Sequence, residues 1–129
     1  MKYDDATYHA DANHTPEQCA VFMALFLAWA AEQGLLGDLH NEAKEELLQR
    51  EVTPGEFLIN NSDCQLTNED FNDEGNQFAQ WYYARRYTSD LLREFPSADL
   101  FAMEDSWSSV DRIKPTLDQR FAYWRNQRN

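Results

Sequence analysis

The clearest pattern of hydrophobic and polar positions along the chain is the run TPEQCAVFMALFLAWAAEQG near the N-terminus. Thr15 and Gln18 can form a capping box around Pro16, which suits a first helical turn, and Gly34 suits the helix end. Between these ends, hydrophobic side chains occupy nearly every side of the helix. A helix of this kind is buried by neighbours on several faces. The pattern therefore predicts a central apolar helix over about residues 16–33.

The middle of the chain shows three further helical patterns. In residues 41–51 leucines lie opposite a row of glutamates, which predicts an amphipathic helix. The Thr53–Pro54 pair repeats the opening of the first helix and predicts a short second capped helix. A long helix is expected from residue 71 or 75 to about residue 95, where Pro96 ends it.

A stripe of apolar residues with 3, 4, 4, 3 spacing predicts that the last helix packs on the core; its members are Val110, Ile113, Leu117, Phe121 and Trp124. This helix is expected to begin near Ser108 or at Pro115, because proline kinks or restarts a helix. The segment 97–107 is the one place where a short extended piece is expected. Together the patterns predict an all-α fold, a single compact bundle of five or six helices around the central helix.

A chain of 129 residues with 43% hydrophobic content is long enough to bury a core, so residues 1–129 are predicted to form a single domain. Residues 1–14 are polar and acidic. We expect them to form an N-terminal arm that frays unless Tyr3 and Tyr8 dock onto the rest of the molecule.

The net charge of −12 is unevenly distributed, with −13 on residues 1–79 and +1 on residues 80–129. Such acidity opposes direct binding of nucleic acid or an anionic membrane and favours a basic protein as partner. The longest apolar run has 13 residues, too few to span a bilayer. No signal peptide is visible at the N-terminus, so a cytoplasmic location is expected.

The stretch DFNDEGNQFAQW begins like a helix–loop–helix calcium site. Asp70, Asn72 and Glu74 occupy its first, third and fifth positions, and Gly75 supplies the turn at the sixth. The twelfth position, where a glutamate should close the site, is Trp81, which has no oxygen to offer. We therefore predict no calcium site here.

Two histidines near the N-terminus, His9 and His14, flank Asp11, and their spacing fits no helical metal pair. Two cysteines, Cys19 and Cys64, are too few for a disulfide framework. The chain has no glycine-rich phosphate loop and no nucleophile elbow. The sequence thus predicts neither an enzyme nor a bound cofactor or metal. A small enzyme or metal-binding protein of unknown reaction remains an alternative.

Two acidic segments are candidates for binding a partner. Residues 63–74 contain five carboxylates and no base, which suits a docking surface as well as a solvated helix start. Trp107 stands among acids in a polar segment, where it either packs inward or anchors an interface. The predicted partner-binding residues are Asp63, Glu69, Asp70, Asp73, Glu74, Glu104, Asp105, Trp107 and Asp111.

Three stretches carry a resemblance to a known family: YDDATYH (residues 3–9), FLAWAAEQGLL (residues 26–36) and EDSWSSVDRIKPTLDQRFAYW (residues 104–124). With these stretches the chain resembles a small acidic all-helical bacterial domain family of uncharacterised function. Members of comparable size recur among the immunity proteins of polymorphic and secreted toxins. The resemblance covers most of the chain and supplies no catalytic residues.

The resemblance and the charge together imply a bacterial immunity protein that binds a cognate toxin and occludes its basic active site with an acidic surface. In that case Trp107 would fill a pocket of the toxin. The main alternative is a nucleic-acid mimic that inhibits a DNA-binding protein, for which a charge of −12 is suitable.

Overall fold

A computed structural model describes residues 1–96 and 99–128. Helices hold 69% of these described residues, which confirms the all-α prediction. The α-helices and strands are β1 (Lys2–Asp5), α1 (Pro16–Glu32), α2 (Lys44–Leu48), α3 (Pro54–Ser62), β2 (Gln65–Thr67), α4 (Asp73–Tyr82), α5 (Thr88–Glu94) and α6 (Trp107–Arg128). Short 3-10 turns η1 (Ala6–Tyr8), η2 (Asp38–His40), η3 (Asn68–Asp70) and η5 (Leu100–Ala102) join them, and a π-helical turn, η4 (Tyr83–Tyr87), links α4 to α5.

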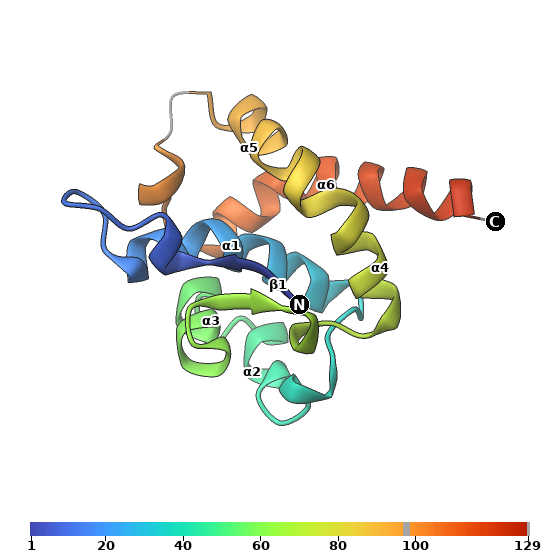
Figure 1. Ribbon diagram of the computed structural model, residues 1–129. Coiled ribbons are helices and arrows are strands. Elements are labelled where there is room, and N and C mark those ends of the chain that lie inside the picture. The colour runs from blue at the N-terminus through green and yellow to red at the C-terminus, as the bar shows by residue number, and fades with distance from the viewer. Residues whose placement is uncertain (97–98, 129) are drawn as a thin grey trace.

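Helix α1 lies at the centre of the molecule, with α2 and α3 on one side of it and α5 and α6 on the other (Figure 1). Its predicted capping box is present, because Thr15 and Gln18 bond to each other's backbone N–H groups. Every residue from Cys19 to Ala31 is buried. Gly34 follows the helix end with φ of 75°, a conformation that favours glycine. The predicted central helix is confirmed.

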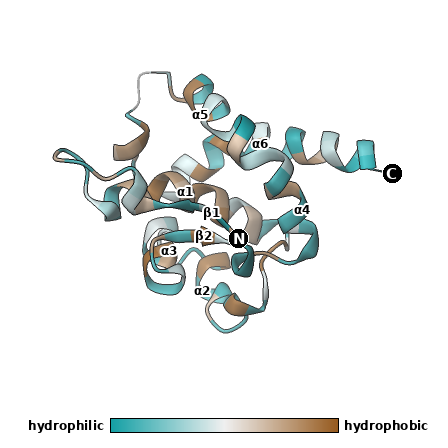
Figure 2. Ribbon diagram, in the orientation of Figure 1, coloured by the Kyte–Doolittle hydropathy of each residue, from teal (hydrophilic) through white to brown (hydrophobic). Residues whose placement is uncertain are grey.

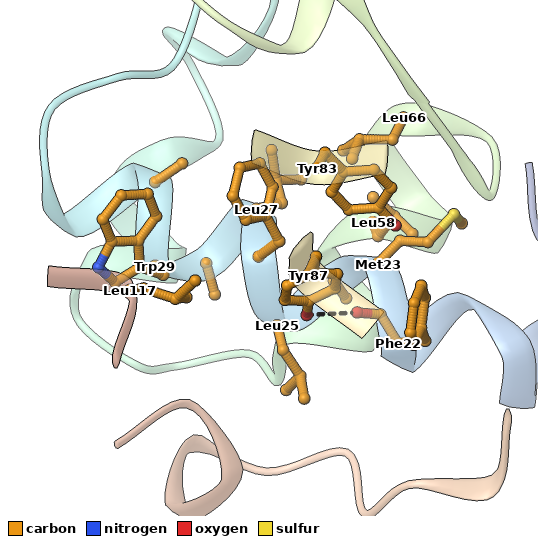
Figure 3. Packing of buried hydrophobic residues seen from close by; sticks show 14 of the residues in the cluster. Phe22, Met23, Leu25, Leu27, Trp29, Leu58, Leu66, Tyr83, Tyr87 and Leu117 are labelled. Atoms are coloured by element: carbon orange, nitrogen blue, oxygen red, sulfur yellow. Dashed lines mark hydrogen bonds between the residues drawn. The ribbon is translucent and has the colours of Figure 1, made fainter. Parts of the chain in front are cut away.

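The core is built from aromatic and aliphatic side chains of α1 and of the elements around it (Figure 3). In Figure 2 the hydrophobic residues of α1 are coloured brown. Tyr87 reaches α1 from η4 and donates its hydroxyl to the Phe22 carbonyl oxygen at 2.7 Å. Trp29, fully buried on α1, donates its indole N–H to Asp118 of α6 at 2.9 Å. Burying rings with their polar atoms satisfied fixes the helices on α1.

Helix α2 is shorter than the predicted helix over residues 41–51. Ala43 precedes it without a side-chain cap, and Arg50 adopts φ of 58° just beyond its end. Only Leu47 of the expected apolar side is fully buried. By contrast α3 begins at the predicted Thr53–Pro54 pair, where Thr53 and Glu56 complete a second capping box. Strong caps were therefore better predictors than the charge pattern of a short helix.

The predicted long helix over residues 71 or 75 to 95 is present as α4, η4 and α5 in succession. Asn72 caps its start by accepting from the Gly75 N–H at 2.8 Å. The wider π turn was not predicted. It accommodates Tyr83 and Tyr87, which are both buried against α1.

Helix α6 begins at Trp107, one residue before the earlier of the two predicted starts, and runs through Pro115 without restarting. The predicted stripe of this helix is buried throughout. Ile113 and Leu117, on either side of the proline, are fully buried. Their packing holds the helix together where proline leaves one backbone bond unmade.

The extended piece expected in residues 97–107 is not found where the structure describes that segment: Leu100–Ala102 forms a 3-10 turn, and residues 97 and 98 lie outside the described residues. The strands lie elsewhere, as an antiparallel pair of β1 and β2. Strand β1 is the first part of the predicted N-terminal arm, residues 1–14, and it is docked by the Tyr3 hydroxyl, which donates to Asn76 Oδ1 at 2.6 Å. Tyr8 is exposed, so Tyr3 alone meets the docking condition.

Candidate partner-binding site

Asp70, the first acid of the calcium-like stretch, points into the molecule and is only 1% exposed. Its Oδ1 lies 2.8 Å from His40 Nε2 and accepts from the Ser62 hydroxyl at 2.5 Å. Its Oδ2 accepts from the Thr67 backbone N–H at 2.7 Å. Asp70 is therefore a structural acceptor and not the surface charge that was expected.

Ser62, His40 and Asp70 bring together the residue types of a hydrolase triad, but their geometry differs from one. In a triad, serine and aspartate contact opposite nitrogens of the histidine. Here both lie on the Nε2 side, with the Ser62 hydroxyl 3.5 Å from that nitrogen. His40 Nδ1 is buried without a hydrogen-bond partner in the described part of the chain. The arrangement suits a packed polar cluster rather than an activated nucleophile.

Asp105, from the second predicted acidic segment, supports the start of α3. Its carboxylate accepts from the Thr53 hydroxyl at 2.6 Å and from the Gly55 N–H at 2.7 Å. A Cβ at position 55 would lie 2.5 Å from Asp105 Oδ2, so a larger residue there would displace this carboxylate. The carboxylate satisfies an N–H group that the helix itself leaves unpaired.

Replacing Asp105 with alanine is expected to lower the free energy of unfolding by about 2 kcal/mol, because two hydrogen bonds to a charged acceptor are lost. Urea unfolding measures the change. Glu104→Ala is the matched control, because Glu104 is exposed and has no ion-pair partner among the described residues; its effect should stay within about 0.5 kcal/mol. Equal effects of the two substitutions would contradict the capping role.

Trp107 also has internal contacts. Its indole N–H donates to the Val52 carbonyl oxygen at 2.9 Å, and the Arg50 guanidinium carbon lies 4.4 Å from its ring centroid. Asp111 in turn accepts from Arg50 at 2.7 and 3.0 Å. Arg50 lowers the pKa of the Asp111 carboxyl, chiefly by donating these hydrogen bonds. The cluster fastens α6 to the segment after α2, which gives Trp107 and Asp111 a structural role.

Glu74 is likewise engaged within the molecule. It accepts from Arg125 at 3.0 Å and from Arg128 at 3.1 Å, so that it connects α4 to the end of α6. Hydrogen bonding from Arg125 lowers the pKa of the Glu74 carboxyl. Its charge is compensated twice over and is not free to attract a partner.

The predicted site residues that are exposed and have no ion-pair partner in the described chain are Asp63, Glu69, Asp73 and Glu104; Asp111 is exposed too, but Arg50 binds it. The two predicted segments lie at opposite ends of α3, because Asp105 contacts its first turn and Asp63 is its C-cap. Nine residues of α-helix span roughly 13 Å. The structure therefore does not bring the two segments together at one point.

The uncompensated charge is concentrated in residues 38–73, which we call the acidic segment. It contains ten carboxylates and two bases, a net charge of −8. Nine of the ten carboxylates are exposed, and within the described chain none of the nine forms an ion pair; they are Asp38, Glu42, Glu45, Glu46, Glu51, Glu56, Asp63, Glu69 and Asp73.

The other carboxylates of the chain behave differently. Of the thirteen outside the acidic segment, nine lie at ion-pair distance from a lysine, arginine or histidine. Of the two bases within the segment, Arg50 is bound by Asp111 and Glu32. The acidic segment thus presents a nearly pure negative potential to solvent.

A hollow of about 430 Å³ opens on this segment between η2, the end of α3, β2 and η3. Polar groups line most of it, including the carboxylates of Asp63 and Glu69. Leu39 and Ile59 add apolar surface, and Leu39 is 54% exposed. Sequence reasoning missed Leu39, because a single leucine between Asp38 and His40 has no periodic pattern to mark it.

His9 and His14, the two histidines considered as metal ligands, contact different carboxylates. His9 contacts Asp4, while His14 lies between Asp11, at 2.9 Å, and Asp99, at 2.6 Å. In residues 1–96 and 99–128, no three His, Cys, Asp or Glu side chains are grouped to hold a metal ion. His14 instead ties the N-terminal loop to the segment that leads into η5.

This tie should depend on pH. Hydrogen bonds to Asp99 and then Asp11 raise the pKa of His14 above its ordinary value, because only the imidazolium can donate from both nitrogens. A raised folded-state pKa contributes stability that is complete below the unfolded value of about 6.5 and is lost as the pH rises through the folded value. His14→Gln should therefore reduce stability in urea at about pH 5.5 and have less effect at about pH 9. An equal loss at both pH values would contradict the role of the charge.

The profile of a family described as a domain of unknown function, DUF7832, matches residues 2–104. The chain belongs to this family. The DUF7832 match includes the acidic segment and its hollow and ends before α6. No curated protein and no solved structure matches the chain. Of the helices that the structure describes, none combines the length and the apolar character required to cross a membrane.

Proposed function

We propose that this protein is a bacterial immunity protein, which binds a cognate basic toxin through the acidic segment and blocks its active site. The observation that carries the proposal is the segregation of unpaired charge. All nine exposed carboxylates of residues 38–73 lack an ion-pair partner in the described chain, whereas most acids elsewhere have one. Self-repulsion of such charges destabilises a free protein, and a basic partner relieves it.

The hollow supplies the second element of a binding surface. Protein interfaces combine an apolar centre with a polar rim. Leu39 and Ile59 provide apolar area, and Asp63 and Glu69 surround it with charge. This arrangement supports an interface centred on Leu39 rather than on Trp107, whose indole N–H and ring already have partners within the chain.

The charge also indicates the class of toxin. An enzyme that acts on an anionic substrate such as nucleic acid has a basic active-site cleft. An acidic inhibitor is steered to such a cleft with association rates well above those of neutral pairs. We therefore infer a nuclease or a similar enzyme as target, with occlusion of its cleft as the mechanism.

A nucleic-acid mimic is the second candidate, and the net charge of −8 on the acidic segment favours it as well. A mimic should bind several DNA-binding proteins, each with steep salt dependence. An immunity protein should bind one partner and retain it at moderate salt, because apolar contacts at the hollow are not screened.

Capture from a lysate of the cells that produce the protein separates these functions. The tagged chain would be washed at about 0.1 M salt and then at several times that concentration, which shortens the Debye length from about 10 Å. One dominant basic protein that survives the second wash, and whose activity the purified chain blocks, supports the immunity function. A mixture of DNA-binding proteins lost in the second wash would support the mimic instead.

A further inference from the structure

A second surface of the molecule carries the opposite charge. Helices α4 and α5, with the η4 turn between them, run alongside α6, and the outer edge of this contact, which we call the arginine seam, contains five arginines; they are Arg86, Arg93, Arg120, Arg125 and Arg128. Three carboxylates face them, namely Glu74, Asp90 and Glu94. Five positive and three negative groups leave +2 on the seam of a protein whose net charge is −12.

The pairing within the seam explains why positive charge remains. Arg125 and Arg128 share the single carboxylate of Glu74. Arg93 and Arg120 share the buried carboxylate of Asp90. Two arginines on one acid leave one positive charge each time, and this charge stays at the surface because the guanidinium groups are partly exposed.

Aromatic side chains lie among these arginines. The Arg86 guanidinium carbon sits 4.2 Å from the Trp81 ring centroid, and Trp81 lies 6.0 Å from Tyr123. Tyr123 is 54% exposed, and it is one of few large side chains with apolar area that face solvent in the described structure. Tryptophan, tyrosine and arginine are the residues most enriched at the energetic centres of protein interfaces.

We propose that the arginine seam binds the acidic segment of a second copy of this chain, so that copies associate head to tail. The two surfaces have opposite charge, −8 against +2, and lie on opposite sides of α1 (Figure 1). The arginine seam of one copy is therefore complementary in charge to the acidic segment of the next copy. The contact is heterologous, so it adds further copies until a ring closes or the chain of copies ends.

Self-association and partner binding use the same acidic segment and therefore compete. When a partner binds the acidic segment, it displaces the arginine seam of the neighbouring copy. Without a partner, that seam covers the unpaired carboxylates of the segment. The inference does not depend on the identity of the partner, because the purified chain alone is sufficient to test it.

Sedimentation velocity of the full chain over a wide concentration range is the first test. We expect the mean mass to rise with concentration at low salt and to return to the 15.2 kDa monomer at about 0.5 M salt, where the Debye length is a few ångströms. Arg86→Glu with Tyr123→Ser should lower the association constant at least about tenfold. Arg112→Glu is the control, since it makes the same change of charge at the other end of α6, over Phe95.

Mixing two variants tests the head-to-tail geometry. Asp63→Lys/Glu69→Lys has an altered acidic segment, and Arg86→Glu/Tyr123→Ser has an altered seam, so each alone should be monomeric. Each retains the surface that the other lacks, and their mixture should form a species of twice the monomer mass and no larger. A monomer at every salt and protein concentration, or an association that the seam variant leaves unchanged, would overturn the proposal.

Discussion

Replacing Phe78 with alanine is expected to lower the free energy of unfolding by about 3–5 kcal/mol, the range found when a large aromatic side chain is removed from a core. Phe78 is fully buried and lies at the meeting point of three helices. Its ring is stacked on Tyr82 of α4 with centroids 5.2 Å apart, tilted against Trp29 of α1 at 5.5 Å and edge-to-face with Phe121 of α6 at 5.1 Å. The surrounding rings are held from three directions, so they cannot collapse into the space that the substitution leaves.

Equilibrium unfolding in urea measures this change, with Leu92→Ala as control. Leu92 is 46% exposed, so its truncation should change stability by no more than about 0.5 kcal/mol. A loss below about 1 kcal/mol for Phe78→Ala would show that the junction of α1, α4 and α6 is not the rigid centre of the fold.

The second large effect is expected at Asp90, which is 1% exposed. Its carboxylate accepts from the Tyr82 hydroxyl at 2.7 Å, from Arg93 at 2.7 Å and from Arg120 twice at 3.0 Å. Burial alone would raise the pKa of Asp90, but the hydrogen bonds from Arg120 and Tyr82 outweigh it, and the pKa lies below its ordinary value. The charged form is therefore the one that the fold requires.

Asp90→Ala should lower the free energy of unfolding by about 2–3 kcal/mol at neutral pH, somewhat less than for a fully buried ion pair, because both arginines reach water. A depressed pKa contributes stability that is present above the unfolded value and is lost as the pH falls through the folded value. The difference between wild type and Asp90→Ala should thus shrink in acid. Arg93→Ala, which removes only the more exposed partner, should cost less than about 1 kcal/mol. A difference that grew in acid would contradict this assignment.

Local sequence rules predicted most of the helices, because caps and apolar stripes act within a few residues. Thr15 and Thr53 mark the starts of α1 and α3 as expected. The rules failed where distant contacts decide. Strand β1 pairs with β2 some sixty residues later in the sequence, and the two strands, of four and three residues, are too short for an alternating pattern to mark them. The π turn depends on packing of Tyr83 and Tyr87 on α1, which spacing alone does not reveal.

The candidate site was predicted only in part for the same reason. Sequence identifies an acid but not its partner, so Asp70, Glu74 and Asp105 resembled docking charges although each is bound within the fold. Asp63 and Glu69 remain exposed beside the hollow. The apolar contribution of Leu39 is a property of the folded surface. The charge imbalance between the two halves of the chain was the useful indicator, because it located the acidic segment.

The central claim is that the acidic segment and its hollow bind one dedicated basic protein. The most direct test is the affinity of the captured partner for three chains: the wild type, Asp63→Lys/Glu69→Lys, and Glu17→Lys/Glu104→Lys. The last pair makes the same charge change at exposed acids outside the segment. We predict at least about a hundredfold weaker binding for the first variant and a change of only a few-fold for the second. Equal affinities of the two variants would show that the partner binds elsewhere or responds to net charge alone.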